Sequence, residues 1–359
     1  MVAFTVHAPP VTPDWEPLFL AGDGPALGGW SPHAVRLDPG PDATHHARVD
    51  LPAGTTARFL VTRGRWRAAE NDGHGHEVPP REVVVTGGDQ DIEVRVAGWG
   101  RDAIHYHHNV RSDLLEHPRT VTVALPPGYD GRRRFPVFYL NDGQNLFDAA
   151  TAFAGVAWGC DETAERVARQ GLAQPVILVG VANTPDRLAE YGPPPAGSEA
   201  AADLARAYGR FLAEEVKPFI DRTYSTRPGP ADTGIGGSSM GALAALHLAE
   251  WHPAVFGRCA ALSPSLWWDR ERFLRALPAR AGWLGACRIW LDMGGREGLT
   301  DATRAANLRR SRRLARLLAK HGMVPGVGFH YLEVPDAEHN EWWWGDRFGQ
   351  VLAFLFPTD

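Results

Sequence analysis

The sequence has few cysteines, no long apolar run and no excess of basic charge. Cys160, Cys259 and Cys287 are its only cysteines, and their odd number and wide spacing argue against a disulfide framework or a zinc cluster. No run approaches the roughly 18 apolar residues that a membrane span needs. Lysine and arginine number 37 against 42 aspartates and glutamates, a formal net charge of −5. We therefore expect no membrane partner and no nucleic-acid partner.

No secretory signal is visible, because residues 1–7 contain neither a basic n-region nor an apolar h-region. Together with the scarcity of cysteine, this favours a reducing, cytoplasmic location. A length of 359 residues suits about two domains. The proportions of 44% hydrophobic and 22% charged residues are those of a globular protein.

The two parts of the chain differ in their hydrophobic patterns. Residues 1–98 contain short β-type runs between clusters of glycine, proline and aspartate, which predicts a small antiparallel β-sandwich. A polar segment over 99–118 contains His105, His107 and His108. A His-x-His pair on a strand would offer two imidazoles to a metal. No carboxylate or cysteine nearby completes such a site, so we expect a linker without metal.

Predicted strands and helices alternate from residue 119 to residue 359. The continuous apolar run over 176–181 is typical of a strand buried on both faces of a sheet. The alternation predicts an α/β domain over 119–359, with a mostly parallel central sheet covered by helices on both faces. The expected strands are 120–125, 136–140, 176–181, 233–235, 258–262, 289–293 and 329–334, and the expected helices are 201–224, 241–251, 303–320 and 346–356.

The most specific motif is the G-x-S-x-G sequence at residues 237–241. A short β run precedes it and a helix of small residues follows it, as a nucleophile elbow requires. In such an elbow Ser239 sits on a strained turn, where side chains at the glycine positions would collide with neighbouring backbone. Ser239 is therefore the candidate nucleophile, and an ordinary Gly-Ser loop is the structural alternative.

A serine nucleophile needs a histidine base and an acid that orients it, here in the chain order Ser, acid, His. His339 follows the last predicted strand and is the candidate base. Two acids lie near the preceding strand: Asp292 within its apolar run and Glu297 just past its end. Because sites lie at the carboxyl ends of such strands, we prefer Glu297.

Two further groups complete the expected pocket. The backbone N–H groups of Met240 and of Gln144, which follows the predicted strand 136–140, are the candidate oxyanion donors. Thirteen tryptophans include clusters at 267–268 and 342–344, which are typical either of a core or interface or of a surface that binds a flat or sugar-like ligand. In the second case Trp267, Trp268, Trp342 and Arg187 would bind the substrate.

From about residue 109 onward the chain resembles the esterase D-type α/β hydrolases, which include enterochelin, feruloyl and acetyl-xylan esterases. This resemblance implies an α/β-hydrolase fold, Ser239 as nucleophile, Glu297 as acid, His339 as base, and no metal or cofactor. Asn141 is a departure, since relatives often have histidine before Asp-Gly. The matching segments are LPPGYD (125–130), YLNDGQNLFD (139–148), WGCDE (158–162), RLAEY (187–191), GGSSMG (236–241), LSPSLWW (262–268), GGREG (294–298) and EHNE (338–341).

The N-terminal part resembles the family 20 starch-binding module, through LGGW (27–30), FLVTRGRW (59–66) and EVPPR (77–81). The resemblance implies that Trp30 and Trp66 stack on glucose rings, and the alternative is a structural or substrate-gating domain.

The sequence thus predicts a serine carboxylic-ester hydrolase that forms an acyl-enzyme. A siderophore trilactone, a carbohydrate-linked ester and a small acyl ester remain open as substrates. The alternative function is a carbohydrate-binding or scaffold protein with an inactive hydrolase domain.

Overall fold

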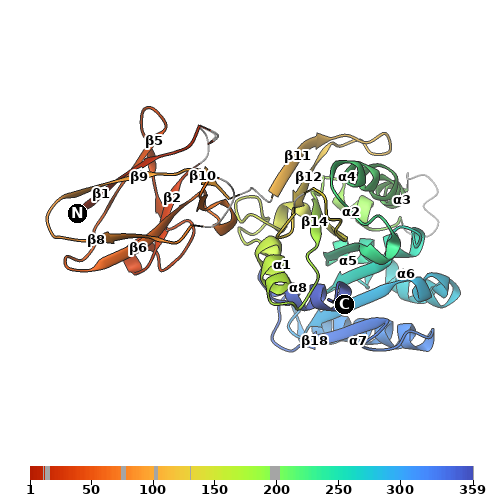
Figure 1. Cartoon of the computed structure of the whole chain (residues 1–359). Helices are drawn as coiled ribbons and strands as arrows, with labels where there is room; N and C mark the ends of the chain where they lie inside the picture. The colour runs from red at the N-terminus through yellow and green to blue at the C-terminus, as the bar shows by residue number, and fades with distance from the viewer. Residues whose placement is uncertain are drawn as a thin grey trace. The chain divides into compact units, whose positions relative to one another are not determined.

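The computed structural model describes the whole chain except residues 11, 13–16, 74–77, 101–103, 130, 195–202 and 359 and the side chain of Arg67. Its contacts divide the chain into two units, Met1–Ala103 and Ile104–Asp359 (Figure 1). Each unit has its own buried core.

The first unit is a sandwich of two four-stranded sheets, in the orders β4-β5-β1-β9 and β3-β2-β6-β8, with a small ladder of β7 and β10 beside them. Val2, Phe4 and Val6 alternate with more exposed residues along β1, so one face of this strand is buried. Phe4 meets Phe59 of the other sheet edge-to-face, with ring centroids 5.2 Å apart. The strands are β1 (Val2–His7), β2 (Phe19–Gly22), β3 (Val35–Arg36), β4 (Asp38–Pro39), β5 (Thr44–Val49), β6 (Thr56–Thr62), β7 (Glu70–Asn71), β8 (Arg81–Val84), β9 (Gln90–Arg95) and β10 (Gly98–Trp99).

One strand pair departs from the antiparallel arrangement expected of this unit. β1 pairs with β9 in parallel, with Val2 opposite Gln90 and His7 opposite Arg95. Parallel neighbours need a long crossover between them, and all the other strands of the two sheets lie between β1 and β9 in the sequence. The alternation of each strand predicts its buried face but carries no information about the direction of its neighbour.

The second unit is built on an eight-stranded sheet in the order β11-β12-β14-β13-β15-β16-β17-β18. β11 and β12 are antiparallel to their neighbours, and the pairs from β14 onward are parallel, which confirms the mostly parallel sheet. The strands are β11 (Ile104–Val110), β12 (Arg119–Ala124), β13 (Val137–Asn141), β14 (Ile177–Val181), β15 (Thr233–Ser238), β16 (Arg258–Leu262), β17 (Arg288–Gly294) and β18 (Phe329–Val334).

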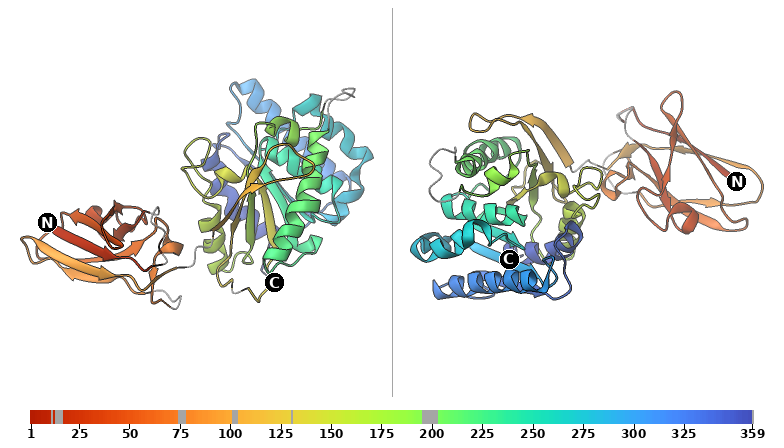
Figure 2. Two further views of the ribbon diagram at one scale, coloured as in Figure 1. Left: turned by 90° about the horizontal axis from the view of Figure 1, so that it is seen from above. Right: turned by 180° about the vertical axis from the view of Figure 1, so that it is seen from behind.

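Helices cover both faces of this sheet, as Figure 2 shows. Residues of α1 and α8 share one core with Phe138, Leu140 and Trp290 of the strands, while α5 packs on β15 and β16. The predicted helix 201–224 is observed as a continuous helical run over 204–223, in which a π-helical segment, Phe211–Val216, joins α3 and α4. Residues 201–202 lie outside the described residues. The helices are α1 (Cys160–Arg169), α2 (Arg187–Tyr191), α3 (Leu204–Arg210), α4 (Lys217–Thr223), α5 (Met240–Trp251), α6 (Trp268–Ala276), α7 (Asp301–Lys320) and α8 (Glu341–Leu355).

The prediction of a linker over residues 99–118 is wrong for its central part, because residues 104–110 form the edge strand β11. His105 and His107 lie opposite Val123 and Val121 of β12, and their ring nitrogens lie 3.0 and 2.7 Å from the hydroxyl of Tyr224. Backbone pairing with β12 stabilises this strand whatever its side chains are, so its polar composition concealed it. The two imidazoles do share a face, but they contact a phenol.

Candidate active site

Ser239 occupies the sharp turn between β15 and α5. Its backbone has φ 55° and ψ −120°, a conformation that L-residues rarely adopt and that is found at functional sites. The flanking glycines are needed for space, as the sequence predicts. A Cβ on Gly237 would lie 2.9 Å from the carbonyl carbon of Gly241, and a Cβ on Gly241 would lie 3.1 Å from Cβ of Asn141. The turn therefore holds the Ser239 hydroxyl at the carboxyl edge of the sheet.

The structure brings Ser239, His339 and Glu297 together in one hydrogen-bonded chain. Nε2 of His339 lies 2.9 Å from Oγ of Ser239, and Nδ1 lies 2.7 Å from Oε2 of Glu297. An ionised carboxylate only accepts hydrogen bonds, so Nδ1–H donates to Glu297 and Nε2 is left to accept from Ser239. Glu297 is 1% exposed, whereas the His339 side chain is 43% exposed. The candidate acid is thus enclosed, while the candidate base is partly exposed.

Asp292, the alternative acid, is held elsewhere. Its Oδ1 accepts from the backbone N–H of Ser263 and from Nη2 of Arg347, each at 3.1 Å, and its Oδ2 accepts from Nε1 of Trp290 at 2.8 Å. Complete burial raises the pKa of Asp292, although the charge of Arg347 opposes the shift. Through these hydrogen bonds Asp292 stabilises the buried residues Ser263, Arg347 and Trp290 beside the site.

The two candidate oxyanion donors lie on loops that are tied together. Met240 is the first residue of α5, so its N–H has no partner within the helix. Gln144 lies in the short 3₁₀ turn Gly143–Asn145, which follows β13. Asn141, at the end of β13, donates through Nδ2 to the carbonyl of Gly241 at 2.7 Å. Asn141, which stands where similar esterases often have histidine, thus links the two loops.

Gly143 lets the turn that carries Gln144 pack closely on β14. A Cβ at this position would lie 2.4 Å from the carbonyl carbon of Gly180. The carbonyl of Gln144 accepts from Thr151, and its side-chain Oε1 accepts from the backbone N–H of Asn183. The turn is thus fixed from both sides.

The predicted substrate-binding residues separate into exposed and engaged groups. Trp267 is 48% exposed and Trp342 is 57% exposed. Trp268 is half-buried and donates through Nε1 to the carbonyl of Pro193 at 3.1 Å. Arg187 donates to both carboxylate oxygens of Asp142 at 2.7 and 2.8 Å, so its charge is already balanced within the protein.

Four further side chains lie around these three residues; sequence reasoning assigned no role to Ser263, Ser265 or Arg347, and considered Trp344 only within the cluster 342–344. Oγ of Ser265 lies 3.3 Å from Oγ of Ser239, and the Trp344 ring meets the His339 ring edge-on at 4.9 Å. Ser263 and Arg347 lie behind Glu297. Both serines follow β16 directly, and their position at the carboxyl end of a parallel strand is the feature that would have indicated them.

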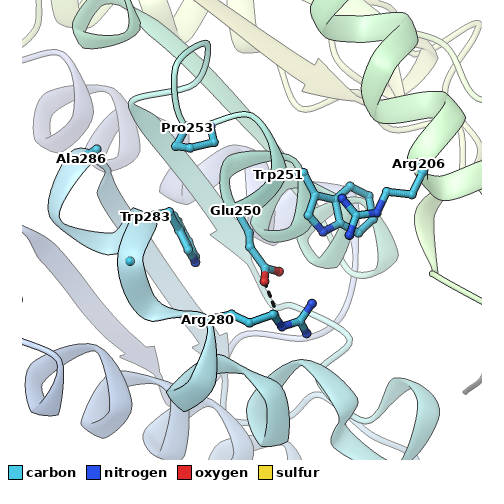
Figure 3. Close-up of a pocket in the computed structure, with 8 residues that line it drawn as sticks. Arg206, Glu250, Trp251, Pro253, Arg280, Trp283 and Ala286 are labelled. Atoms are coloured by element: carbon cyan, nitrogen blue, oxygen red, sulfur yellow. Dashed lines mark ion pairs between the residues drawn. The ribbon is translucent and has the colours of Figure 1, made fainter.

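An open pocket lies away from the triad, at the other end of α5 (Figure 3). Its volume is about 560 Å³, and Glu250, Trp251, Arg280 and Trp283 are among the residues that line it. α5 has 12 residues, so about 18 Å of helix separates this pocket from Met240. It therefore lies too far from Ser239 to hold a reacting ester bond.

The described residues include neither a candidate metal-binding cluster nor an exposed thiol. No group of three or more His, Cys, Asp or Glu side chains among them is placed to hold a metal ion. Burial raises the pKa of the thiols of Cys160, Cys259 and Cys287, which keeps them protonated and unreactive. None of the described helices combines the length and the apolar character needed to cross a membrane.

Comparison with known proteins assigns the chain to a family. The family model described as "Putative esterase" matches residues 112–355, and the chain belongs to this esterase family. Membership supports carboxylic ester hydrolysis as the activity and agrees with the α/β-hydrolase architecture.

Individual relatives cover different parts of the chain. It is 26% identical over 198 residues to the uncharacterized protein YbbA of Bacillus subtilis, covering 53% of this chain and 74% of that protein. It is 38% identical over 64 residues to a siderophore enterobactin esterase of Emericella nidulans, covering 18% of this chain and 21% of that protein. The crystal structure of the enterobactin esterase FES from Shigella flexneri shares the fold, with a TM-score of 0.53 and 17% identity over 94% of this chain and 88% of that one.

Proposed function

We propose that this protein is a serine carboxylic-ester hydrolase that works through an acyl-enzyme. The observation that carries the proposal is the chain from Ser239 through His339 to Glu297, with contacts of 2.9 and 2.7 Å. A nucleophile within reach of a base, itself oriented by a third group, is the arrangement that activates a serine hydroxyl. A scaffold protein with an inactive hydrolase domain, the alternative function, would not require these contacts.

In the first half of the reaction Oγ of Ser239 attacks the ester carbonyl while Nε2 of His339 takes its proton. Glu297 stabilises the imidazolium through Nδ1–H. The N–H groups of Met240 and Gln144 hold the negative charge on the carbonyl oxygen of the tetrahedral intermediate. His339 then gives the proton to the leaving alcohol, and the acyl group stays on Ser239.

In the second half water attacks the acyl-serine, and His339 removes a proton from it. The exposed side of His339 provides the route for this water. Collapse of the second tetrahedral intermediate releases the carboxylic acid and restores the Ser239 hydroxyl. No cofactor takes part in this sequence of steps.

The substrate we favour is an ester whose acyl part carries an aromatic ring. Exposed Trp267 and Trp342 offer indole faces for stacking, whereas Arg187 is occupied by Asp142. Catecholate trilactones and feruloyl-sugars both fit this description, and the esterases named among the relatives act on siderophores. Burial of three free cysteines suits a cytoplasmic location for the protein.

Hydrolysis of enterobactin, a feruloyl-sugar and p-nitrophenyl acetate by the purified protein tests this proposal. We expect one of the two larger esters to have a kcat/KM at least about fivefold above that of p-nitrophenyl acetate, because stacking on tryptophan contributes on the order of 1 kcal/mol. Trp342→Ala should remove this preference. Tyr106→Ala, which removes an exposed aromatic ring from the edge strand β11, is the matched control and should preserve it. Absence of turnover with all three esters would favour the scaffold alternative.

A second candidate function, glycan binding, concerns the first unit. The rings of Trp30 and Trp66 lie 6.1 Å apart at 47°, and Trp66 is exposed. Such a pair suits the faces of successive sugar rings.

We expect the full chain to be retained on insoluble α-glucan and Trp66→Ala to bind about tenfold more weakly. Trp342→Ala, which removes an exposed tryptophan of the other unit, should be retained like the wild type. Equal elution of Trp66→Ala and the wild type in a glucan pull-down would argue against a sugar site at this pair.

A further inference from the structure

The Ser263 hydroxyl lies within hydrogen-bond distance of four buried side chains next to the proposed triad. Its Oγ lies 2.5 Å from Oε1 of Glu297, 3.1 Å from Nε1 of Trp344 and 3.1 Å from Nη2 of Arg347. A longer contact of 3.5 Å reaches Oδ1 of Asp292. Ser263 is 2% exposed, so solvent does not compete for these bonds.

The chemistry of these partners fixes the direction of each hydrogen bond. An indole N–H and a guanidinium N–H can only donate, so Trp344 and Arg347 occupy the two acceptor positions of the Ser263 oxygen. The single hydroxyl proton of Ser263 must then point to a carboxylate, and the nearer one is Glu297. Oε1 of Glu297 also accepts from the backbone N–H of Gly294 at 2.8 Å. Both donors are therefore on Oε1, and Oε2 is left to His339.

Asp292 and Arg347 hold Ser263 in this position. Oδ1 of Asp292 accepts from both the Ser263 backbone N–H and Nη2 of Arg347, each at 3.1 Å. Ser263 itself has φ 48°, a left-handed conformation that favours glycine over other residues. The presence of serine in this conformation indicates that its hydroxyl has a use there.

We propose that Ser263 is a positioning residue of the triad: its hydroxyl, oriented by Arg347 and Trp344, binds Oε1 of Glu297 and thereby directs Oε2 to His339. This inference rests on the proposed function, since it assigns Ser263 a role only through Glu297. It predicts that removal of the hydroxyl affects the transition state, in which His339 is charged, more than the binding of substrate.

Two substitutions at this position test the proposal. Ser263→Ala and Ser263→Gly both remove the hydroxyl, but glycine suits φ 48° and alanine does not. Loss of one buried hydrogen bond to a carboxylate should lower kcat about 10- to 100-fold in both variants and leave KM within about twofold. Full kcat in Ser263→Gly would overturn the proposal, because the role of serine would then be only to fill a backbone position.

A double-substitution cycle with Glu297→Gln separates positioning from general damage. In Glu297→Gln the amide that Ser263 still binds can no longer orient His339 productively, so adding Ser263→Gly to Glu297→Gln should change kcat by less than about threefold. An unchanged 10- to 100-fold loss in that background would overturn the inference and leave the triad intact. Undiminished kcat in Glu297→Gln alone would instead overturn the proposed triad, and this inference with it.

Discussion

Ser239→Ala is expected to lower kcat for ester hydrolysis by about a millionfold, the loss typical of removing a serine nucleophile. The substitution deletes the oxygen that lies 2.9 Å from Nε2 of His339 and leaves the base with nothing to activate. The remaining N–H donors and the binding surface still act, so a residual rate above that of water is expected. Release of p-nitrophenolate by purified, folded protein measures the loss.

A fluorophosphonate probe checks the same residue by covalent labelling. The probe should attach to Ser239 in the wild type and leave Ser239→Ala unlabelled. Ser265 provides an internal control, since its hydroxyl is only 3.3 Å away but forms no hydrogen bond to a histidine of the described residues. A labelled peptide containing residue 265 instead of 239 would place the nucleophile elsewhere. Failure of the folded wild type to react would favour the inactive scaffold.

The sequence was most informative where parallel strands are buried on both faces. The predicted strands 176–181 and 258–262 correspond to β14 and β16, whose residues are almost all buried. The carboxyl ends of parallel strands meet at one edge of a sheet. Residues that follow β15, β17 and β18 were therefore expected to lie close together, and Ser239, Glu297 and His339 do so.

The support behind the triad was beyond sequence reasoning, because it depends on side chains from distant segments. Arg347 lies 84 positions after Ser263 in the chain, on α8, and reaches it only through the packing of that helix on the sheet. The exposed turn of α8 carries Trp342, whereas Trp344, two residues later, is buried against His339. The cluster 342–344 thus serves both as surface and as core, a division that composition does not reveal.

Glu297→Gln is expected to lower kcat about ten-thousandfold, as removal of a triad acid does elsewhere. The geometry gives a specific reason. Position Oε1 receives two donors, Gly294 N–H and Ser263 O–H, so the amide oxygen of glutamine takes that place and its NH₂ group faces Nδ1 of His339. Nδ1 must then accept, the ring proton moves to Nε2, and Nε2 can no longer take the proton of Ser239. Steady-state kinetics on several esters should show the same loss in kcat for each.

Asp292→Asn is the matched comparison, because it removes the other buried carboxylate near the same strand end. Its partners are Ser263, Arg347 and Trp290, so we expect at most about a tenfold loss in kcat from the weakened support of Ser263. The larger effect should be on stability, where the loss of the carboxylate nearest to buried Arg347 costs about 3 kcal/mol, measured by chemical denaturation. A folded Asp292→Asn without activity beside a fully active Glu297→Gln would make Asp292 the acid. The opposite pattern separates the carboxylate that orients His339 from the one that neutralises Arg347.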